Sequence, residues 1–240
     1  MPDQQQSTAA SSGVTPGVTI EQAHALERVS AARATAHVLL EIGAALCYDD
    51  EPFTFTSGRR SPVYVDCRQI ISYPRARAKL MDLSVQLIER EIGYEGIDVV
   101  AGGETAGIAF AAWIAERMGL PMAYIRKQPK GFGRMAQIEG NMPEGSRVLL
   151  VEDLATDGGS KINFINAVRE AGGQISDCLV LFHYGIFPAS VSSLKEVGVN
   201  LHGLTTWWDV IAEAEDRGYF PPDKAKVVRS FLENPEGWTP

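Results

Sequence analysis

The chain has 240 residues, of which 45% are hydrophobic and 22% are charged. This composition is typical of a folded globular protein and excludes disorder as the main state. The formal net charge of −8 argues against a general nucleic-acid-binding protein, which needs a broad basic surface. Any anionic ligand must therefore be held by a local basic cluster. The longest apolar run is too short to cross a bilayer and no secretory signal is visible, so we expect a soluble protein.

Three cysteines are present, at wide spacing: Cys47, Cys67 and Cys178. Their odd number and spacing indicate neither a disulfide framework nor a thiolate metal site. We interpret them as core residues of a protein of the reducing cytoplasm. Residues 1–19 are rich in Gln, Ser, Thr and Ala without periodicity, which predicts a disordered tail.

The next part of the chain predicts an N-terminal appendage over residues 20–74. Apolar residues at helical spacing in an Ala-rich segment predict a helix over Glu21–Leu46. The segment Phe53–Ile71 is typical of a hairpin or bent strand pair, with Ser57 and Gly58 at its turn.

Strands and helices then alternate over residues 75–206. Helices are predicted over Arg75–Glu91, Gly107–Met118 and Ser160–Ala171, with Gly93 as a C-cap of the first. Strands are predicted over Ile97–Ala101, Met122–Arg126, Val148–Glu152 and Cys178–Phe182. Such alternation requires crossover connections and favours an α/β fold with a mostly parallel sheet flanked by helices. A last strand follows Asn200, and two short helices fill residues 207–240, which completes a single domain over residues 20–240.

The segment Lys127–Gly145 interrupts this alternation with a long stretch that lacks periodicity. Long loops in compact domains are uncommon and are usually functional or mobile. This one carries Lys127, Lys130 and Arg134 just after Arg126, with no acidic residue before Glu139. We interpret it as the basic cluster that an acidic protein needs for an anionic ligand, with a solvated surface loop as the alternative.

The most specific pattern is the segment Val148–Ser160. A hydrophobic strand ends in Glu152 and Asp153, and a loop of small residues leads to a helix. Ligands of open α/β sheets bind beyond the carboxyl ends of the strands, and the backbone N–H groups of such a loop suit a phosphate. The spacing is not that of a P-loop, because no Lys follows the glycines Gly158 and Gly159. The two acids would hold ribose hydroxyls or a divalent metal, so ribose 5-phosphate fits; incidental acids before a capped helix are the alternative.

This segment resembles the ribose-phosphate signature of type I phosphoribosyltransferases, which use 5-phosphoribosyl 1-diphosphate and Mg²⁺. Two further segments, Phe53–Asp66 and Arg126–Gly140, resemble the N-terminal motif and the flexible catalytic loop of orotate phosphoribosyltransferases. The resemblance implies a type I phosphoribosyltransferase-like fold. It also implies transfer of ribose 5-phosphate to orotate, giving orotidine 5′-monophosphate and diphosphate, in pyrimidine biosynthesis. The family further implies a homodimer with shared active sites.

The resemblance also implies roles for individual residues. Substrates would be contacted from the signature, the catalytic loop, the N-terminal motif and the turn after the first core strand, by Glu152, Asp153, Leu154, Ala155, Thr156, Asp157, Gly158, Gly159, Ser160, Arg126, Lys127, Lys130, Tyr64, Val65, Thr105 and Ala106. The catalytic residues would be Lys130, Arg134 and Asp153, and Asp153 would also contact Mg²⁺. Thr156 stands where 6-oxopurine transferases have Asp and adenine transferases usually have Ala, which favours a pyrimidine; a Thr that merely stabilises the loop is the alternative.

The chain departs from the family pattern at three places. Phe132 replaces the usual His of the catalytic loop, for which Arg134 would substitute, and Thr56 replaces the Lys of some members. The stretch Phe182–Tyr184 lacks the Arg that often pairs with the orotate carboxylate.

Several alternatives stay open at this point. Arg59, Arg60 and Arg68 would serve either a dimer interface or the diphosphate. The chain could act on another base, or be a non-catalytic regulator that senses phosphoribosyl diphosphate.

Overall fold

The computed structural model describes residues 19–48, 50–55, 58–131, 133, 136–156 and 159–239. Several predictions lie outside these residues: the tail up to residue 18, and the roles of Thr56, Phe132, Arg134, Asp157 and Gly158, together with the side chain of Ser160. No helix in the described ranges is both long enough and apolar enough to cross a membrane.

A six-stranded sheet forms the centre of the fold, in the order β10-β9-β8-β5-β6-β7. Its strands are β5 (Val99–Gly103), β6 (Met122–Ile125), β7 (Ile138–Glu139), β8 (Arg147–Ala155), β9 (Gln174–His183) and β10 (Asn200–Thr206). All neighbours pair in parallel except β7, which is antiparallel to β6. The predicted mostly parallel sheet is therefore confirmed. The expectation that Lys127–Gly145 lacks regular structure is wrong at β7, a short strand that the periodicity was too brief to indicate.

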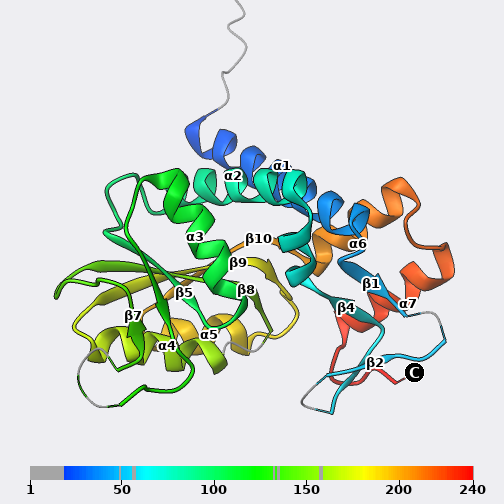
Figure 1. The fold of residues 1–240 in the computed structure, drawn as a ribbon. Coiled ribbons are helices and arrows are strands. Elements are labelled where there is room, and N and C mark those ends of the chain that lie inside the picture. Colours follow the sequence, from blue (N-terminus) through cyan, green and yellow to red (C-terminus); the bar gives the residue numbers. More distant parts are fainter. Residues whose placement is uncertain are drawn as a thin grey trace, which may run out of the picture.

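Helices cover both faces of the sheet and bury two apolar clusters against it. Figure 1 shows α1 (Ile20–Glu41), α2 (Pro74–Glu91) and α3 (Ala106–Met118) on one face, and α4 (Gly159–Glu170) and α5 (Ala189–Glu196) on the other. The helix α5 is not among the predicted ones, because its short Ser-rich sequence has weak helix propensity. Cys67 and Cys178 are buried in these clusters as expected, whereas Cys47 is only half-buried.

The predicted end of the first helix is wrong. The helix α1 ends at Glu41, and Gly43 adopts the left-handed conformation with φ of 67°, which ordinary residues avoid. The chain then forms β1 (Ala45–Cys47), which pairs antiparallel with β4 (Val63–Val65). Gly43 therefore divides the predicted segment into a helix and a strand.

The predicted hairpin is confirmed, although it is shorter than expected. Strand β2 (Phe53–Thr54) pairs antiparallel with β3 (Arg60–Ser61). After β4 the chain turns into the 3₁₀ helix η1 (Cys67–Ser72), where Asp66 caps the first turn by accepting a hydrogen bond from the Arg68 N–H. The segment up to Ile71 is thus a hairpin, a third strand and a helical turn.

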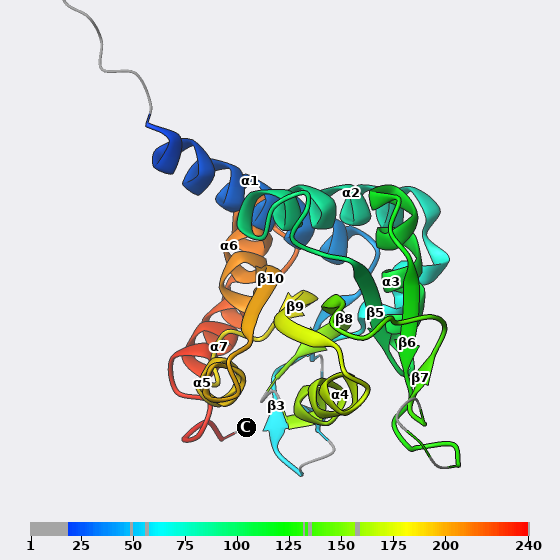
Figure 2. The same ribbon diagram turned by 90° about the vertical axis from the view of Figure 1, so that its left-hand side faces the viewer.

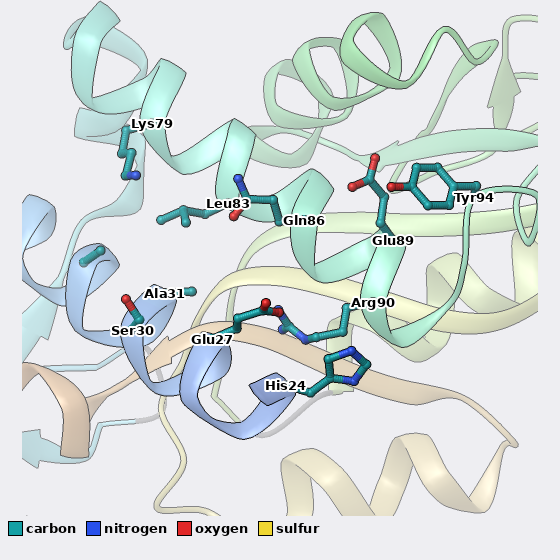
Figure 3. A pocket seen from close by; sticks show the side chains of 11 residues that line it. His24, Glu27, Ser30, Ala31, Lys79, Leu83, Gln86, Glu89, Arg90 and Tyr94 are labelled. Carbon is teal, nitrogen blue, oxygen red and sulfur yellow. The ribbon is translucent and has the colours of Figure 1, made fainter. Parts of the chain in front are cut away.

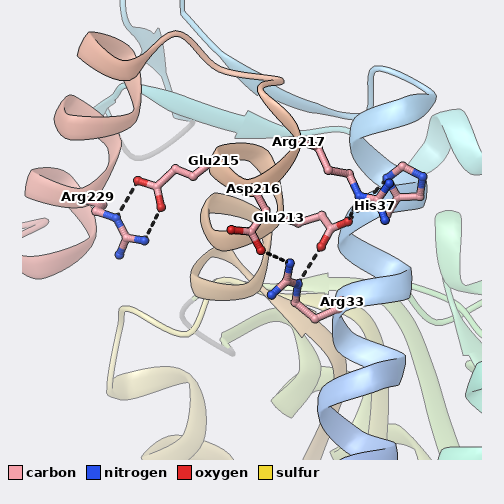
Figure 4. Close-up of polar contacts among 7 residues, drawn as sticks. All are labelled: Arg33, His37, Glu213, Glu215, Asp216, Arg217 and Arg229. Carbon is pink, nitrogen blue, oxygen red and sulfur yellow. Dashed lines mark hydrogen bonds and ion pairs between the residues drawn. The ribbon is translucent and has the colours of Figure 1, made fainter.

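Two C-terminal helices, α6 (Trp207–Arg217) and α7 (Pro222–Glu233), lie beside the appendage strands, as Figures 1 and 2 show. A capping box between Thr206 and Asp209 starts α6 directly at the end of β10. Ion pairs join α6 to α1 through Arg33, whose Nε lies 2.6 Å from Glu213 (Figure 4). These contacts fix the appendage next to the carboxyl ends of the sheet strands.

Candidate active site

A cavity of about 350 Å³ lies at the carboxyl ends of β5, β6 and β8. Residues from five segments line it: Arg68 of η1; Glu104, Thr105 and Ala106 of the β5–α3 turn; Lys127 and Gln128 after β6; Glu152 and Asp153 of β8; and Asn163 and Phe164 of α4. This is the edge at which ligands of open α/β sheets bind. The structure therefore brings the acidic pair, the β5–α3 turn and one loop lysine together around one cavity.

Glu152 occupies a slot that two glycines leave open. Its side chain is only 7% exposed, and a Cβ atom built on Gly103 or Gly107 would lie 2.5 or 2.6 Å from Glu152 Oε1. Burial raises the pKa of Glu152 to about 7. Lys161, Lys127 and Arg68 oppose the rise, and Asp153 adds to it. The first acid of the pair is thus held rigidly at the back of the cavity.

Lys161 was not predicted as a site residue, yet it is the main positive charge acting on Glu152. It lies in the first turn of α4 and is 3% exposed. A buried ammonium group requires a nearby negative charge, because burial disfavours the charged form. The sequence carried a signal: Lys161, Ile165 and Val168 share the spacing of one helix face, and the latter two are core residues.

Asp153 faces the cavity with a side chain that is 14% exposed. Its Oδ1 accepts a hydrogen bond from the Leu154 N–H at 2.9 Å, and its Oδ2 lies 4.0 Å from Arg68 Nε. The side chain of Arg68 is 73% exposed, so it can reorient toward a ligand. Among the arginines whose role the sequence left open, Arg68 is therefore placed beside the acidic pair.

The β5–α3 turn forms a wall that is tied to the strand next to it. The backbone N–H of Glu104 donates to Ile125 O at 2.9 Å, and Glu104 Oε2 accepts from the Lys127 N–H at 2.8 Å. The peptide bond between Glu104 and Thr105 is cis. Glu104 is not among the predicted site residues, yet its carboxylate orients the start of the basic loop.

The basic loop places its cations at different distances from the cavity. Lys127 lines it, whereas the guanidinium of Arg126 lies 3.5 Å from Glu139 on β7 and donates to Gln128 O at 3.3 Å. Lys130 is exposed, and its N–H donates to Ala136 O at 2.7 Å. Neither Arg126 nor Lys130 lines the cavity, so their contacts with substrate stay a prediction that requires movement of the loop.

The signature residue Ala155 is linked through Tyr184 to Phe55 of the N-terminal appendage. The Tyr184 N–H donates to Ala155 O at 2.9 Å, and the Tyr184 ring packs edge-on against Phe55 at 5.8 Å. Leu154 and Thr156 are half-buried.

The two predicted residues on β4 differ in exposure. Tyr64 is 40% exposed, and Val65 is 1% exposed. Val65 can therefore offer a ligand only its backbone, whereas Tyr64 can also offer its ring.

A larger groove of about 570 Å³ lies between α1 and α2 (Figure 3). The guanidinium group of Arg90, which lines the groove, lies 2.9 Å from the carboxylate of Glu91 and 3.8 Å from that of Glu27. None of the signature or loop residues that the structure describes lines this groove. We assign the site to the smaller cavity because the acids, the cations and the strand ends converge there.

The donor set of the cavity suits a hard cation that a substrate carries. The described residues contain no group of three or more His, Cys, Asp or Glu side chains that could hold a metal by themselves. The cavity does present carboxylates from Glu104, Glu152 and Asp153. Mg²⁺ prefers oxygen ligands and commonly binds through one or two carboxylates together with substrate phosphates.

Comparison with known proteins agrees with this geometry. The family model "Phosphoribosyl transferase domain" matches residues 68–192, which include β5 and β8, the strands that carry Gly103 and Glu152. A protein of Cereibacter sphaeroides called orotate phosphoribosyltransferase is 56% identical over 211 residues, covering 88% of this chain and 91% of its own. The crystal structure of orotate phosphoribosyltransferase from Aeropyrum pernix is 32% identical, with a TM-score of 0.66, over 78% of this chain and 99% of its own. The chain belongs to the phosphoribosyltransferase family and, within it, to the orotate phosphoribosyltransferases.

The likeness in fold extends to the structure of Leishmania donovani UMP synthase. That comparison has a TM-score of 0.72 at 24% identity, and it covers 89% of this chain and 44% of the other. The similarity therefore includes most of the appendage and the C-terminal helices as well as the sheet.

Proposed function

We propose that the cavity binds 5-phosphoribosyl 1-diphosphate and that the chain transfers its ribose 5-phosphate to orotate, giving orotidine 5′-monophosphate and diphosphate. The observation that carries this proposal is the convergence of Glu152 and Asp153 with Lys127, Arg68 and the Thr105 turn. The acids suit ribose hydroxyls, and the cations suit the diphosphate.

The chemistry needs positioning more than a nucleophile from the protein. As the bond from the ribose C1 carbon to the diphosphate breaks, C1 acquires oxocarbenium character and the leaving group gains negative charge. Fixed carboxylates under the ribose and cations at the diphosphate stabilise that charge separation. Glu152, held in its glycine slot, would orient the ribose, and Lys127 and Arg68 would face the departing diphosphate.

Mg²⁺ fits this arrangement as a metal that arrives with the substrate. Asp153, whose carboxylate faces the cavity, would hold it directly or through water. The ion would neutralise the leaving diphosphate when bound. The partial burial of Asp153 and its bond from the Leu154 N–H would keep the carboxylate oriented.

We also propose a homodimer and a cytoplasmic location. Lys130 is exposed and does not line the cavity, which supports a role at a neighbouring subunit. Closure of that loop would exclude water from an oxocarbenium-like centre. The three cysteines, all within the described residues, form no disulfide, which is usual in a reducing compartment.

The test is an assay of orotate consumption with 5-phosphoribosyl 1-diphosphate and Mg²⁺. Lys130→Ala and Asp153→Asn should each lower kcat at least about 100-fold, since each removes one charged group from the transition state. Lys195→Ala, on the exposed side of α5, is the matched control and should keep full activity. Turnover of another base but not orotate would indicate a different transferase. Binding of 5-phosphoribosyl 1-diphosphate without turnover of any base would indicate a non-catalytic regulator.

A further inference from the structure

Orotate carries a carboxylate next to the ring nitrogen that reacts. This inference rests on the proposed function, because it concerns how that carboxylate is recognised. A carboxylate that enters a site largely closed to water needs a cation or several hydrogen-bond donors. The cations that line the described cavity, Arg68 and Lys127, lie beside the acids and the diphosphate-side wall.

The sheet order decides on which side the base must lie. A nucleophile approaches C1 from the face opposite the leaving group. The diphosphate-side wall follows β5 and β6, on one side of β8, so the base must approach from the side of β9 and the appendage. The base therefore meets the segment that follows β9.

That segment is an aromatic platform on which one arginine is stacked. The backbone N–H of Tyr184 donates a hydrogen bond to Ala155 O, and the Tyr184 ring stacks with that of Phe187, with ring centroids 6.2 Å apart. The guanidinium carbon of Arg59 lies 4.6 Å from the centroid of the Phe187 ring. Arg59 precedes β3, and its carbonyl accepts from the Phe55 N–H at 2.8 Å across the hairpin. Stacking orients the planar guanidinium, which is the group best suited to bidentate binding of a carboxylate.

The guanidinium of Arg59 already binds a carboxylate in the structure. Its Nη2 lies 2.7 Å from Oε1 of Glu236, a residue of the C-terminal segment whose side chain is 76% exposed. An exposed pair of this kind is weak, so an incoming carboxylate can displace it.

We propose that Arg59 binds the carboxylate of orotate and that Glu236 occupies Arg59 when orotate is absent. Arg59 thereby supplies the positive charge that the stretch Phe182–Tyr184 lacks. His183 is the other candidate on this side, and it is less suited. Its Nε2 lies 2.7 Å from Ser190 Oγ, and burial together with Lys161 lowers its pKa, which favours a neutral ring.

The experiment compares Arg59→Gln with Arg28→Gln in the full chain. Arg28 is the matched control, because it is an exposed arginine paired with Glu91 on the far side of the fold. Three quantities are measured: KM for orotate, KM for 5-phosphoribosyl 1-diphosphate, and the inhibition constant of uracil, a pyrimidine without the carboxylate. Arg59→Gln should raise KM for orotate about 10- to 100-fold, as expected for loss of a charge-assisted pair. The other two constants should change less than about twofold, and Arg28→Gln should match the wild type.

Two results would overturn the inference. One is a folded Arg59→Gln chain with an unchanged KM for orotate. The other is an equal rise in KM for orotate and in the inhibition constant of uracil, since Arg59 would then only shape the pocket. Failure of the wild type to consume orotate would instead refute the proposed function.

A second variant decides the matter if Arg59→Gln does not fold. Glu236→Gln removes the competing carboxylate and leaves Arg59 in place. It should lower KM for orotate by up to about fivefold, the range of an exposed ion pair. An unchanged KM would contradict the role assigned to Arg59 and Glu236.

Discussion

Gly103 and the carboxylate of Glu152 lie so close that no side chain fits between them. A Cβ on Gly103 would stand 2.5 Å from Glu152 Oε1 and 2.7 Å from Phe164 Cε2. Gly103 ends β5, and Glu152 lies near the end of β8, so the close approach joins the strand that leads into the Glu104–Ala106 turn to the strand that carries the acidic pair. The position of the first acid thus depends on the absence of a side chain on the neighbouring strand.

Gly103→Ala should therefore impair substrate binding. The new methyl group would push Glu152 out of its slot, and we expect KM for 5-phosphoribosyl 1-diphosphate to rise at least about tenfold, with a loss of about 1–3 kcal/mol in the free energy of unfolding. Gly173→Ala is the control: its Cβ would lie 2.9 Å from Val168 Cγ1, away from the cavity. It should destabilise the fold and leave KM unchanged. Equal kinetic effects of the two variants would contradict this account.

The raised pKa of Glu152 makes stability depend on pH. Below the ordinary value of 4.5 the carboxyl group is protonated in both states, and between 4.5 and about 7 only the folded chain keeps the proton. The free energy of unfolding therefore falls as pH rises through this window, by roughly 3 kcal/mol in all. Glu152→Gln removes this pH dependence. The melting temperature of the substrate-free variant should therefore fall less between pH 4.5 and pH 8 than that of the wild type, and the variant should lose activity. A difference in melting temperature that is the same at both pH values would contradict the prediction.

The alternation of strands and helices could be predicted because each element has a clear apolar period or run. The residues at which elements end are harder to predict from the sequence. The predicted helix over Glu21–Leu46 is too long, since Ala-rich sequence continues through Gly43 and the left-handed backbone there separates α1 from β1. The short α5 and β7 have too few residues for any period to be visible.

The candidate site was predictable where its residues are adjacent in the chain. Glu152 and Asp153 form a motif by themselves. Glu104 and Arg59 act through contacts between elements, which the sequence does not display. Helical spacing places Lys161 on the core face of α4 but does not indicate its proximity to Glu152. The burial of Lys161 follows from the packing of α4 on the sheet, and the pairing of Arg59 with Glu236 joins residues 177 positions apart. Such contacts are set by topology, so they emerge only from the folded chain.

Glu213 on α6 is a buried acceptor for two arginines, as Figure 4 shows. It binds Arg33 and Arg217, and the ring of His37 lies 3.7 Å away. Glu213→Gln should lower the free energy of unfolding by about 1–3 kcal/mol, since charge-assisted hydrogen bonds in a buried position are lost. The control is Glu215→Gln, whose carboxylate pairs with Arg229 at the surface and should matter less than about 1 kcal/mol. Urea titration measures both, and equal losses would contradict the prediction. The kcat of each variant should be unchanged.

Lys161 is the main positive charge that keeps the pKa of Glu152 from rising further. Lys161→Met removes that charge and keeps an unbranched side chain that is one heavy atom shorter. The pKa of Glu152 should rise further, so the carboxyl group should be protonated at neutral pH and bind ribose hydroxyls poorly. We expect KM for 5-phosphoribosyl 1-diphosphate to rise at pH 7 and to recover partly at pH 9.

The measurement is a pH profile of kcat/KM for 5-phosphoribosyl 1-diphosphate. Its acidic limb should move to higher pH in Lys161→Met, whereas Lys195→Met, an exposed change of the same kind on α5, should leave it in place. A variant that loses activity equally at all pH values would show that Lys161 acts only through packing. Ionisation of Glu152 would then not depend on the buried lysine, and the electrostatic role of the first turn of α4 would be refuted.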